Sequence, residues 1–294
     1  MFWVESGDGI VDAQMRAGVL RSVLASLVVA AVGVACSLTD LSGFSEPEAS
    51  TDAGTGLPDV SVASGDGSTS PDAEGGDPNS AYGAVVSADS PVAFYRFDDP
   101  SDSNFAKDSI GLHNANITSP GVQLGSPGLR GGAATFDGSG VLDVGDAFDF
   151  AGKQPFTLEL WVRPKGAQVQ GQLIHKRDES ATPFKGYILY GDNNGTSHFE
   201  AWGVDLSAYS SDVLASTFSH VVVTVSYASG KGNATLFVNA KPSPQGGFDN
   251  TLDLADTPAH LRFGNVFTGV LDEIALYDKA LPTDRILAHY RAGR

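Results

Sequence analysis

Residues 156–163 read FTLELWVR, and this run indicates the fold class of the chain. Its apolar side chains at positions 156, 158, 160 and 162 share one face of an extended strand, whereas Glu159 and Trp161 lie on the other. Alternation with a period of two predicts a β-strand with one face on an apolar core. The same alternation returns in residues 221–227, so the chain contains more than one such strand.

Short β-favouring runs fill the chain from residue 81 onward, separated by Gly, Pro, Asn and Asp. No helix of ordinary length is expected before Pro282, which excludes a parallel sheet with crossover helices, and residues 282–290 predict a short closing helix. The fold class is therefore all-β, a two-sheet antiparallel sandwich of the jelly-roll kind. The expected strands are 92–98, 133–136, 141–144, 156–163, 172–176, 187–190, 198–202, 220–227, 235–238, 260–263 and 270–277.

The chain is acidic and has one cysteine. Its 294 residues include 35 Asp and Glu against 18 Lys and Arg, which gives a net charge of −17. Such a chain repels phosphate backbones, so nucleic acid is a poor partner. A single cysteine, Cys36, excludes a disulfide framework and a zinc site with several thiolates.

The N-terminal part has the features of an export signal. Residues 23–35 form an apolar run of signal-peptide length, and Cys36 follows it directly. Residues 15–35 resemble a bacterial lipoprotein signal peptide, which implies that Cys36 carries the lipid and anchors the protein to a membrane. Ser37 is similar to the sorting pattern for the outer membrane of the cell envelope. The alternative is an ordinary secretory signal that is cleaved near Ala35.

Two further segments flank this signal. Residues 1–14 carry three acids and no base, which does not suit the basic start of a signal peptide, so we expect translation to begin at Met15. Residues 36–80 are rich in Ser, Thr, Asp, Gly and Pro and contain nine acids but no Lys or Arg. This composition predicts a disordered acidic linker. Residues 81–294 then form the folded domain.

Six blocks of this domain occur in the order and spacing of a known family. They are VAFYRFD (92–98), DSIG (108–111), ATFDGSG (134–140), FTLELWVRP (156–164), FSHVVVT (218–224) and GVLDEIALYDKAL (269–281). Together they resemble the laminin-G-like domain, a concanavalin A-like jelly roll of extracellular proteins, over residues 90–292. The resemblance implies a domain that binds glycans or proteins and commonly holds a structural calcium ion. A fold shared by many functions does not by itself establish an activity.

The resemblance also implies a position for the calcium ion. In related jelly rolls the ion joins the first strands to the last one through backbone carbonyls and an Asp of the final strand. The matching positions are Asp272 for the carboxylate, Gly138 for a carbonyl, and the turn at Asp98 and Asp99. Calcium takes roughly six to eight oxygen ligands in irregular geometry, which suits such a junction. The alternative is that Asp272 and Glu273 are paired or solvated carboxylates.

Four aromatic or imidazole side chains are candidates for ligand binding. Trp161 has the parity that points away from the core, and Tyr190, His198 and Trp202 lie near another strand pair with polar residues 192–194 between them. Aromatic rings with amide groups nearby can bind sugars by stacking and hydrogen bonding. The alternative, which we favour for these rings, is ordinary packing.

Enzyme signals are scarce in the sequence. The glycosidases of this architecture carry a Glu-x-Asp-x-x-Glu pattern on one strand, whereas here Trp161 stands two residues after Glu159. We therefore expect a non-enzymatic, lipid-anchored binding module for glycan or protein ligands at the bacterial cell envelope. One alternative is a polysaccharide-processing enzyme whose activity is lost with an exposed carboxylate such as Glu200. Another is a structural or adhesion component of an envelope complex.

Overall fold

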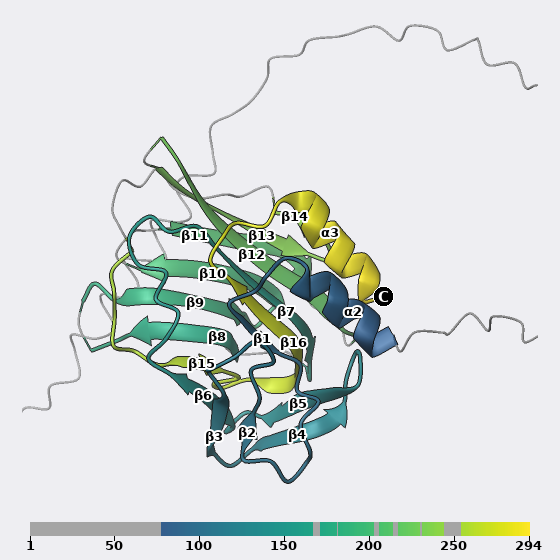
Figure 1. The fold of residues 1–294 in the computed structure, drawn as a ribbon. Helices are drawn as coiled ribbons and strands as arrows, with labels where there is room; N and C mark the ends of the chain where they lie inside the picture. The colour runs from purple at the N-terminus through teal and green to yellow at the C-terminus, as the bar shows by residue number, and fades with distance from the viewer. Residues whose placement is uncertain are drawn as a thin grey trace, which may run out of the picture. The chain divides into compact units, whose positions relative to one another are not determined.

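The structure is a computed structural model in which two antiparallel sheets pack face to face, as the sequence predicts (Figure 1). The expected signal peptide, Cys36 and nearly all of the acidic linker lie outside the described residues. The described residues are 78–166, 171–180, 182–202, 206–213, 217–229, 231–243 and 254–294.

Within the described residues, each sheet has eight strands. Sheet A has the order β14-β13-β12-β7-β16-β5-β4, and β1 pairs with the C-terminal half of β16. Sheet B has the order β11-β10-β9-β8-β15-β6-β3-β2. The strands of sheet A are β1 (Ala93–Tyr95), β4 (Val122–Pro127), β5 (Gly132–Asp137), β7 (Phe156–Pro164), β12 (Ser219–Ala228), β13 (Lys231–Val238), β14 (Lys241–Pro242) and β16 (Thr268–Tyr277). The strands of sheet B are β2 (Phe105–Ala106), β3 (Ala115–Ser119), β6 (Val141–Gly145), β8 (Gly171–Asp178), β9 (Lys185–Gly191), β10 (Thr196–Trp202), β11 (Leu206–Val213) and β15 (Leu261–Phe263).

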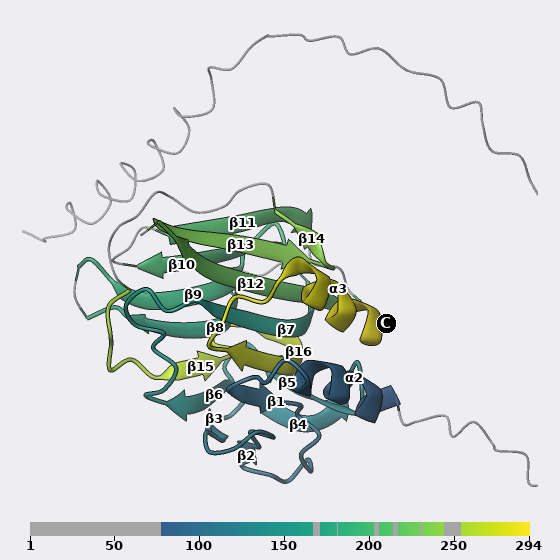
Figure 2. The same cartoon turned by 45° about the horizontal axis from the view of Figure 1, so that its top comes forward.

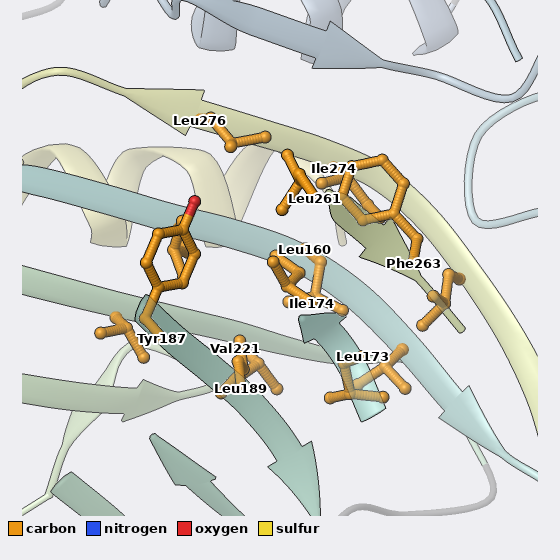
Figure 3. Close-up of a cluster of buried hydrophobic side chains, with 14 of the residues drawn as sticks. Leu160, Leu173, Ile174, Tyr187, Leu189, Val221, Leu261, Phe263, Ile274 and Leu276 are labelled. Carbon is orange, nitrogen blue, oxygen red and sulfur yellow. The ribbon is translucent and has the colours of Figure 1, made fainter. Parts of the chain in front are cut away.

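The main core lies between the two sheets. The alternation of β7 is confirmed, because all four of its apolar side chains from 156 to 162 are buried in this core. Burial of large apolar side chains at about 25 cal/mol per Å² is the main favourable contribution to such a sandwich. Figure 3 shows side chains from both sheets pointing toward one another, with Leu160, Leu173, Ile174, Tyr187, Leu189, Val221, Leu261, Phe263, Ile274 and Leu276 labelled.

Two helices, α2 (Pro78–Ser87) and α3 (Thr283–Ala292), lie side by side over the outer face of sheet A (Figures 1 and 2). The closing helix is confirmed, but the prediction of no ordinary helix before Pro282 is wrong. The sequence of α2 contains Gly83 and has little amphipathic pattern. Its stability comes from tertiary packing, since Tyr82 and Val86 are buried in a second apolar cluster beneath the helices. Neither ten-residue helix of the described chain reaches the length and apolarity needed to cross a membrane.

Three strands of ordinary length were not predicted. They are β3, β4 and β11, whose sequences ANITS, VQLGSP and LSAYSSDV are polar or contain Gly and Pro. Pairing with neighbouring strands forms them in spite of weak β-propensity, which is common near the edges of a sheet.

Candidate functional site

The outer face of sheet B carries a stacked pair of rings. Tyr190 on β9 pairs across the strands with His198 on β10, and their ring centroids are 5.1 Å apart with an interplanar angle of 14°. Their neighbours Leu189 and Phe199 point into the core, so strand alternation places Tyr190 and His198 on the outside. Both candidate residues are thereby brought together, and the side chain of His198 is 28% exposed.

Carboxylates hold both rings in place. The Tyr190 hydroxyl donates to Glu200 Oε1 at 2.9 Å, and His198 Nε2 lies 3.1 Å from Asp192 Oδ2. Partial burial and the nearby Glu200 raise the pKa of Tyr190 above its usual range, so the phenol stays a hydrogen-bond donor. Trp202, the third candidate here, belongs to β10, but its side chain lies outside the described residues. The face therefore offers a ligand two fixed rings, one of them an imidazole, and two carboxylates.

His175 lies on the same face and was missed as a site residue, because isolated histidines in a sequence are more often structural. It pairs with Arg262 across β8 and β15 and with Ile188 across β8 and β9. Only 7% of the residue is exposed, and neither ring nitrogen has a hydrogen-bond partner. Burial, with Arg177 nearby, lowers the pKa of His175 to about 4, so its ring is neutral at pH 7. Glu179 Oε1 lies 3.8 Å from Nε2, beyond hydrogen-bond distance, so the buried ring nitrogens stay unsatisfied, which is costly.

Trp161 has to be set aside as a ligand-binding residue. It leaves the main core as its parity predicts, but α2 and α3 cover it and only 2% of it is exposed. Its Nε1 donates to the Tyr82 hydroxyl oxygen at 3.0 Å, and the Tyr290 ring stacks on it at 6.0 Å. No exposed ring face is left for a sugar, so Trp161 serves packing.

A buried polar network surrounds Glu159 beneath the same helices. Its Oε1 accepts hydrogen bonds from Tyr82 at 3.3 Å and His220 at 2.8 Å, and its Oε2 accepts one from Tyr277 at 2.9 Å. His289 of α3 lies within 3.0 Å of both oxygens, and its other ring nitrogen is 2.7 Å from Asp89. The network therefore connects sheet A to both helices.

Electrostatics fix the charges of this network. Burial alone would raise the pKa of Glu159, but His289 and His220 outweigh it and hold that pKa well below its usual range. Burial opposes the charged form of His289, yet Glu159 and Asp89 raise its pKa above the ordinary value. The side chains of Glu159, His220 and His289 are 0% exposed. In this arrangement the network stabilises the helices and offers no surface to a substrate.

The structure brings two of the four predicted calcium ligands together. Asp272 and Asp98 meet near Gly132, whose backbone N–H donates to Asp98 Oδ1 at 2.8 Å, while Asp99 accepts the N–H of Lys107. Gly138 follows the residue that pairs with Thr268, at the opposite end of the β5–β16 ladder from Asp272.

The carboxylates at this junction already have partners within the protein. The two oxygens of Asp272 accept backbone N–H groups of Leu129 at 2.7 Å and Glu273 at 2.9 Å. Burial raises the pKa of Asp272 well above its usual range, although these N–H groups oppose the rise. Arg96 lies 3.4 Å from both Asp98 and Glu273, so a cation is already present. Among the residues described, no group of three or more His, Cys, Asp or Glu side chains is placed to hold a metal.

Comparison with known proteins identifies similar folds. A laminin-G family model, described as the concanavalin A-like lectin/glucanases superfamily, matches residues 136–287. No curated protein sequence matches the chain.

Solved structures resemble the domain at low sequence identity. The binding domain of Paraclostridial Mosquitocidal Protein 1 is 17% identical with a TM-score of 0.52, covering 67% of this chain and 51% of that one. Trypanosoma rangeli sialidase in complex with sialic acid is 16% identical with a TM-score of 0.51, covering 67% and 32%. Domain 4 of AbnA, a GH43 extracellular arabinanase from Geobacillus stearothermophilus in complex with arabinotriose, is 16% identical with a TM-score of 0.51, covering 68% and 98%. The chain thus spans about half of the first protein and a third of the second, and the likeness concerns the fold.

Proposed function

Because the chain belongs to the concanavalin A-like lectin/glucanases superfamily, we propose that its folded domain is a non-enzymatic module that binds carbohydrate on the outer face of sheet B. The observation that carries the proposal is the Tyr190–His198 ring pair with Glu200 and Asp192 beside it. Sugars are bound by ring contacts together with a few fixed polar groups, and this face has both.

The solved structures support this ligand class by analogy of fold. One neighbour is a domain in complex with arabinotriose, and another is a sialidase in complex with sialic acid. We propose binding without catalysis, because the strand carboxylate Glu159 is buried beneath the helices and Glu200 accepts a hydrogen bond from Tyr190. Glycoside hydrolysis generally needs two carboxylates that flank the scissile bond.

Replacement of Tyr190 by alanine is expected to weaken binding of the glycan that a glycan array identifies by at least about tenfold, because the ring contact and the hydrogen bond to Glu200 are lost together. Tyr190→Phe removes only the hydroxyl and should lose less. Isothermal titration calorimetry measures both. Leu112→Ala is the control, since that side chain is exposed and lies off this face.

Other outcomes of the same experiment decide between the alternatives. Hydrolysis of the glycan by the wild-type chain, lost in Glu200→Gln, identifies a polysaccharide-processing enzyme. An array without hits, followed by specific capture of a protein from an envelope extract, identifies an adhesion component. Either result contradicts the proposed module.

We also propose that Cys36 anchors this module to a membrane of the bacterial cell envelope. The support is the apolar run at residues 23–35, which ends directly before the single cysteine. Incorporation of labelled palmitate into the expressed chain, abolished by Cys36→Ser, is the expected result. An unmodified thiol in purified membranes contradicts it.

A further inference from the structure

A surface pocket lies on the outer face of sheet A. Thr135, Val270 and Arg163 stand side by side across β5, β16 and β7, while the residues that alternate with them, Ala134 and Leu271 among them, point into the core. The pocket that they line has a volume of about 520 Å³, within the usual range for small-molecule sites. It lies on the opposite sheet from the Tyr190–His198 pair.

The pocket contains an oriented guanidinium group. The Arg163 guanidinium lies over the Phe218 ring at 4.7 Å, and this cation–π contact fixes its plane. Among the residues described, that guanidinium makes no hydrogen bond or ion pair, so its in-plane N–H donors remain available. A planar guanidinium with free donors binds a carboxylate through two parallel hydrogen bonds.

Lys165 adds a second cation to the wall of the pocket. The strand end that carries it is fixed, because its backbone N–H donates to the Thr268 carbonyl at 2.9 Å. Two bases in one pocket stand out in a chain with a net charge of −17. At physiological salt, charges beyond roughly 8 Å are screened, so the groups that line the pocket, two bases and the single acid Asp137, determine its local charge. The pocket therefore favours an anionic group.

One carboxylate also lines the pocket. Asp137 accepts hydrogen bonds from the Ser139 N–H at 2.9 Å and the Ser139 hydroxyl at 2.8 Å, and these hold its pKa below the ordinary value. Asp137 is therefore ionised at pH 7 and repels a second carboxylate, but it can accept a hydrogen bond from a hydroxyl. The side chains of Thr135 and Thr268 bring hydroxyl groups to the same wall.

We propose that this pocket binds a uronate residue of an acidic glycan, with Arg163 on its carboxylate and Asp137 on one of its hydroxyls. A sugar acid carries a carboxylate and hydroxyl donors on one small ring, which matches both charges of the pocket. An acidic peptide side chain brings a carboxylate without hydroxyls, so it meets the same repulsion from Asp137 as a uronate does but donates no hydrogen bond to offset it. This site goes beyond the proposed function, because it uses the other sheet and another ligand chemistry.

Calorimetric titration of the full chain with trigalacturonate tests the proposal. Arg163→Ala should weaken binding by at least about tenfold, since a hydrogen bond to a charged group contributes more than a neutral one. Arg163→Lys keeps the charge but loses the planar fork, so it should recover only part of the affinity. Lys279→Ala is the control with the same charge change, because Lys279 is exposed and lies outside the pocket.

Control ligands and a sheet B variant separate the uronate site from the alternatives. Trigalactose, which has the same rings without carboxylates, should not compete. Tyr190→Ala should leave trigalacturonate binding unchanged while it weakens binding at sheet B. The proposal is overturned if the wild-type chain does not bind trigalacturonate, or if Arg163→Ala, melting at the wild-type temperature, binds it as well as Lys279→Ala does. Equal binding of hexaglutamate overturns it in favour of an acidic peptide.

Discussion

Replacing Glu159 with alanine is expected to lower the free energy of unfolding by about 3–5 kcal/mol, the range seen when one partner of a buried ion pair is removed. The side chain is 0% exposed and receives hydrogen bonds from Tyr82, Tyr277 and His220, besides the contact with His289. Alanine leaves these donors buried without an acceptor, and each unsatisfied group is costly. Urea denaturation, read from the midpoint at an unchanged slope, measures the loss.

The matched control is Glu179→Ala, because that carboxylate is 51% exposed and pairs at the surface with Arg177. We expect it to change the free energy of unfolding by less than about 0.5 kcal/mol. A change of the same small size for Glu159→Ala contradicts the role of the network in holding α2 and α3 to sheet A.

The pH dependence of stability follows from the same network. The pKa of His289 is raised in the folded state, so the stability from its proton is complete below the ordinary pKa of 6.5 and is lost as the pH rises through the raised value. The pKa of Glu159 is lowered, so its contribution is present above the ordinary 4.5 and is lost as the pH falls through the lowered value. Glu159→Ala should flatten both limbs of the curve.

Replacing Lys176 with methionine is the second large effect that we expect, a loss of about 3 kcal/mol in the free energy of unfolding. The ammonium group is 0% exposed and contacts four oxygens from two distant loops. It lies 2.8 Å from Asp146, 3.1 Å from Asp149, 3.3 Å from the carbonyl of Thr257 and 2.6 Å from that of Ala259. Methionine fills a similar volume but leaves these oxygens without a donor.

The expected loss lies at the lower end of the range for a broken buried ion pair, because Asp146 is half exposed and is hydrated again when Lys176 is replaced. Lys185→Met is the control, since Lys185 is exposed on the neighbouring strand and should change the unfolding free energy by less than about 0.5 kcal/mol. The double variant Lys176→Met/Asp149→Leu should recover part of the loss, because the partner carboxylate is then absent as well. If Lys176→Met is as stable as the wild type, the two loops are held by other contacts and the prediction is wrong.

The two-sheet sandwich followed from the sequence because strand alternation is a local property. In the run at 156–163, the order of residues alone distinguishes the face that packs on the core from the face that points outward. The helix α2 has no such signal, since its ten residues become helical by packing on a sheet that forms far away in the sequence. A local pattern cannot report a contact that depends on the finished fold.

The candidate site was predictable in part for the same reason. The sequence placed Tyr190 and His198 near one strand pair, and their direct cross-strand pairing is visible only in the structure. The covering of Trp161 depends on helices that the alternation does not show. The burial of Lys176 was not predictable from alternation. A bulge in β8 inserts Leu173 and thereby shifts the later side chains to the other face. Arg163 has the outward parity, but its contact with Phe218 joins separate strands and is visible only in three dimensions.

The side-by-side arrangement of α2 and α3 brings the two ends of the described domain together. In both views the C-terminal end lies beside the first turn of α2, on the sheet opposite the Tyr190–His198 pair (Figures 1 and 2). A short peptide from Arg294 to Pro78 therefore suffices to join the two ends in a circular permutant. The same proximity lets the domain be inserted as a cassette into a host loop, or coupled to a sensor chip, with its sheet B face turned to the solution.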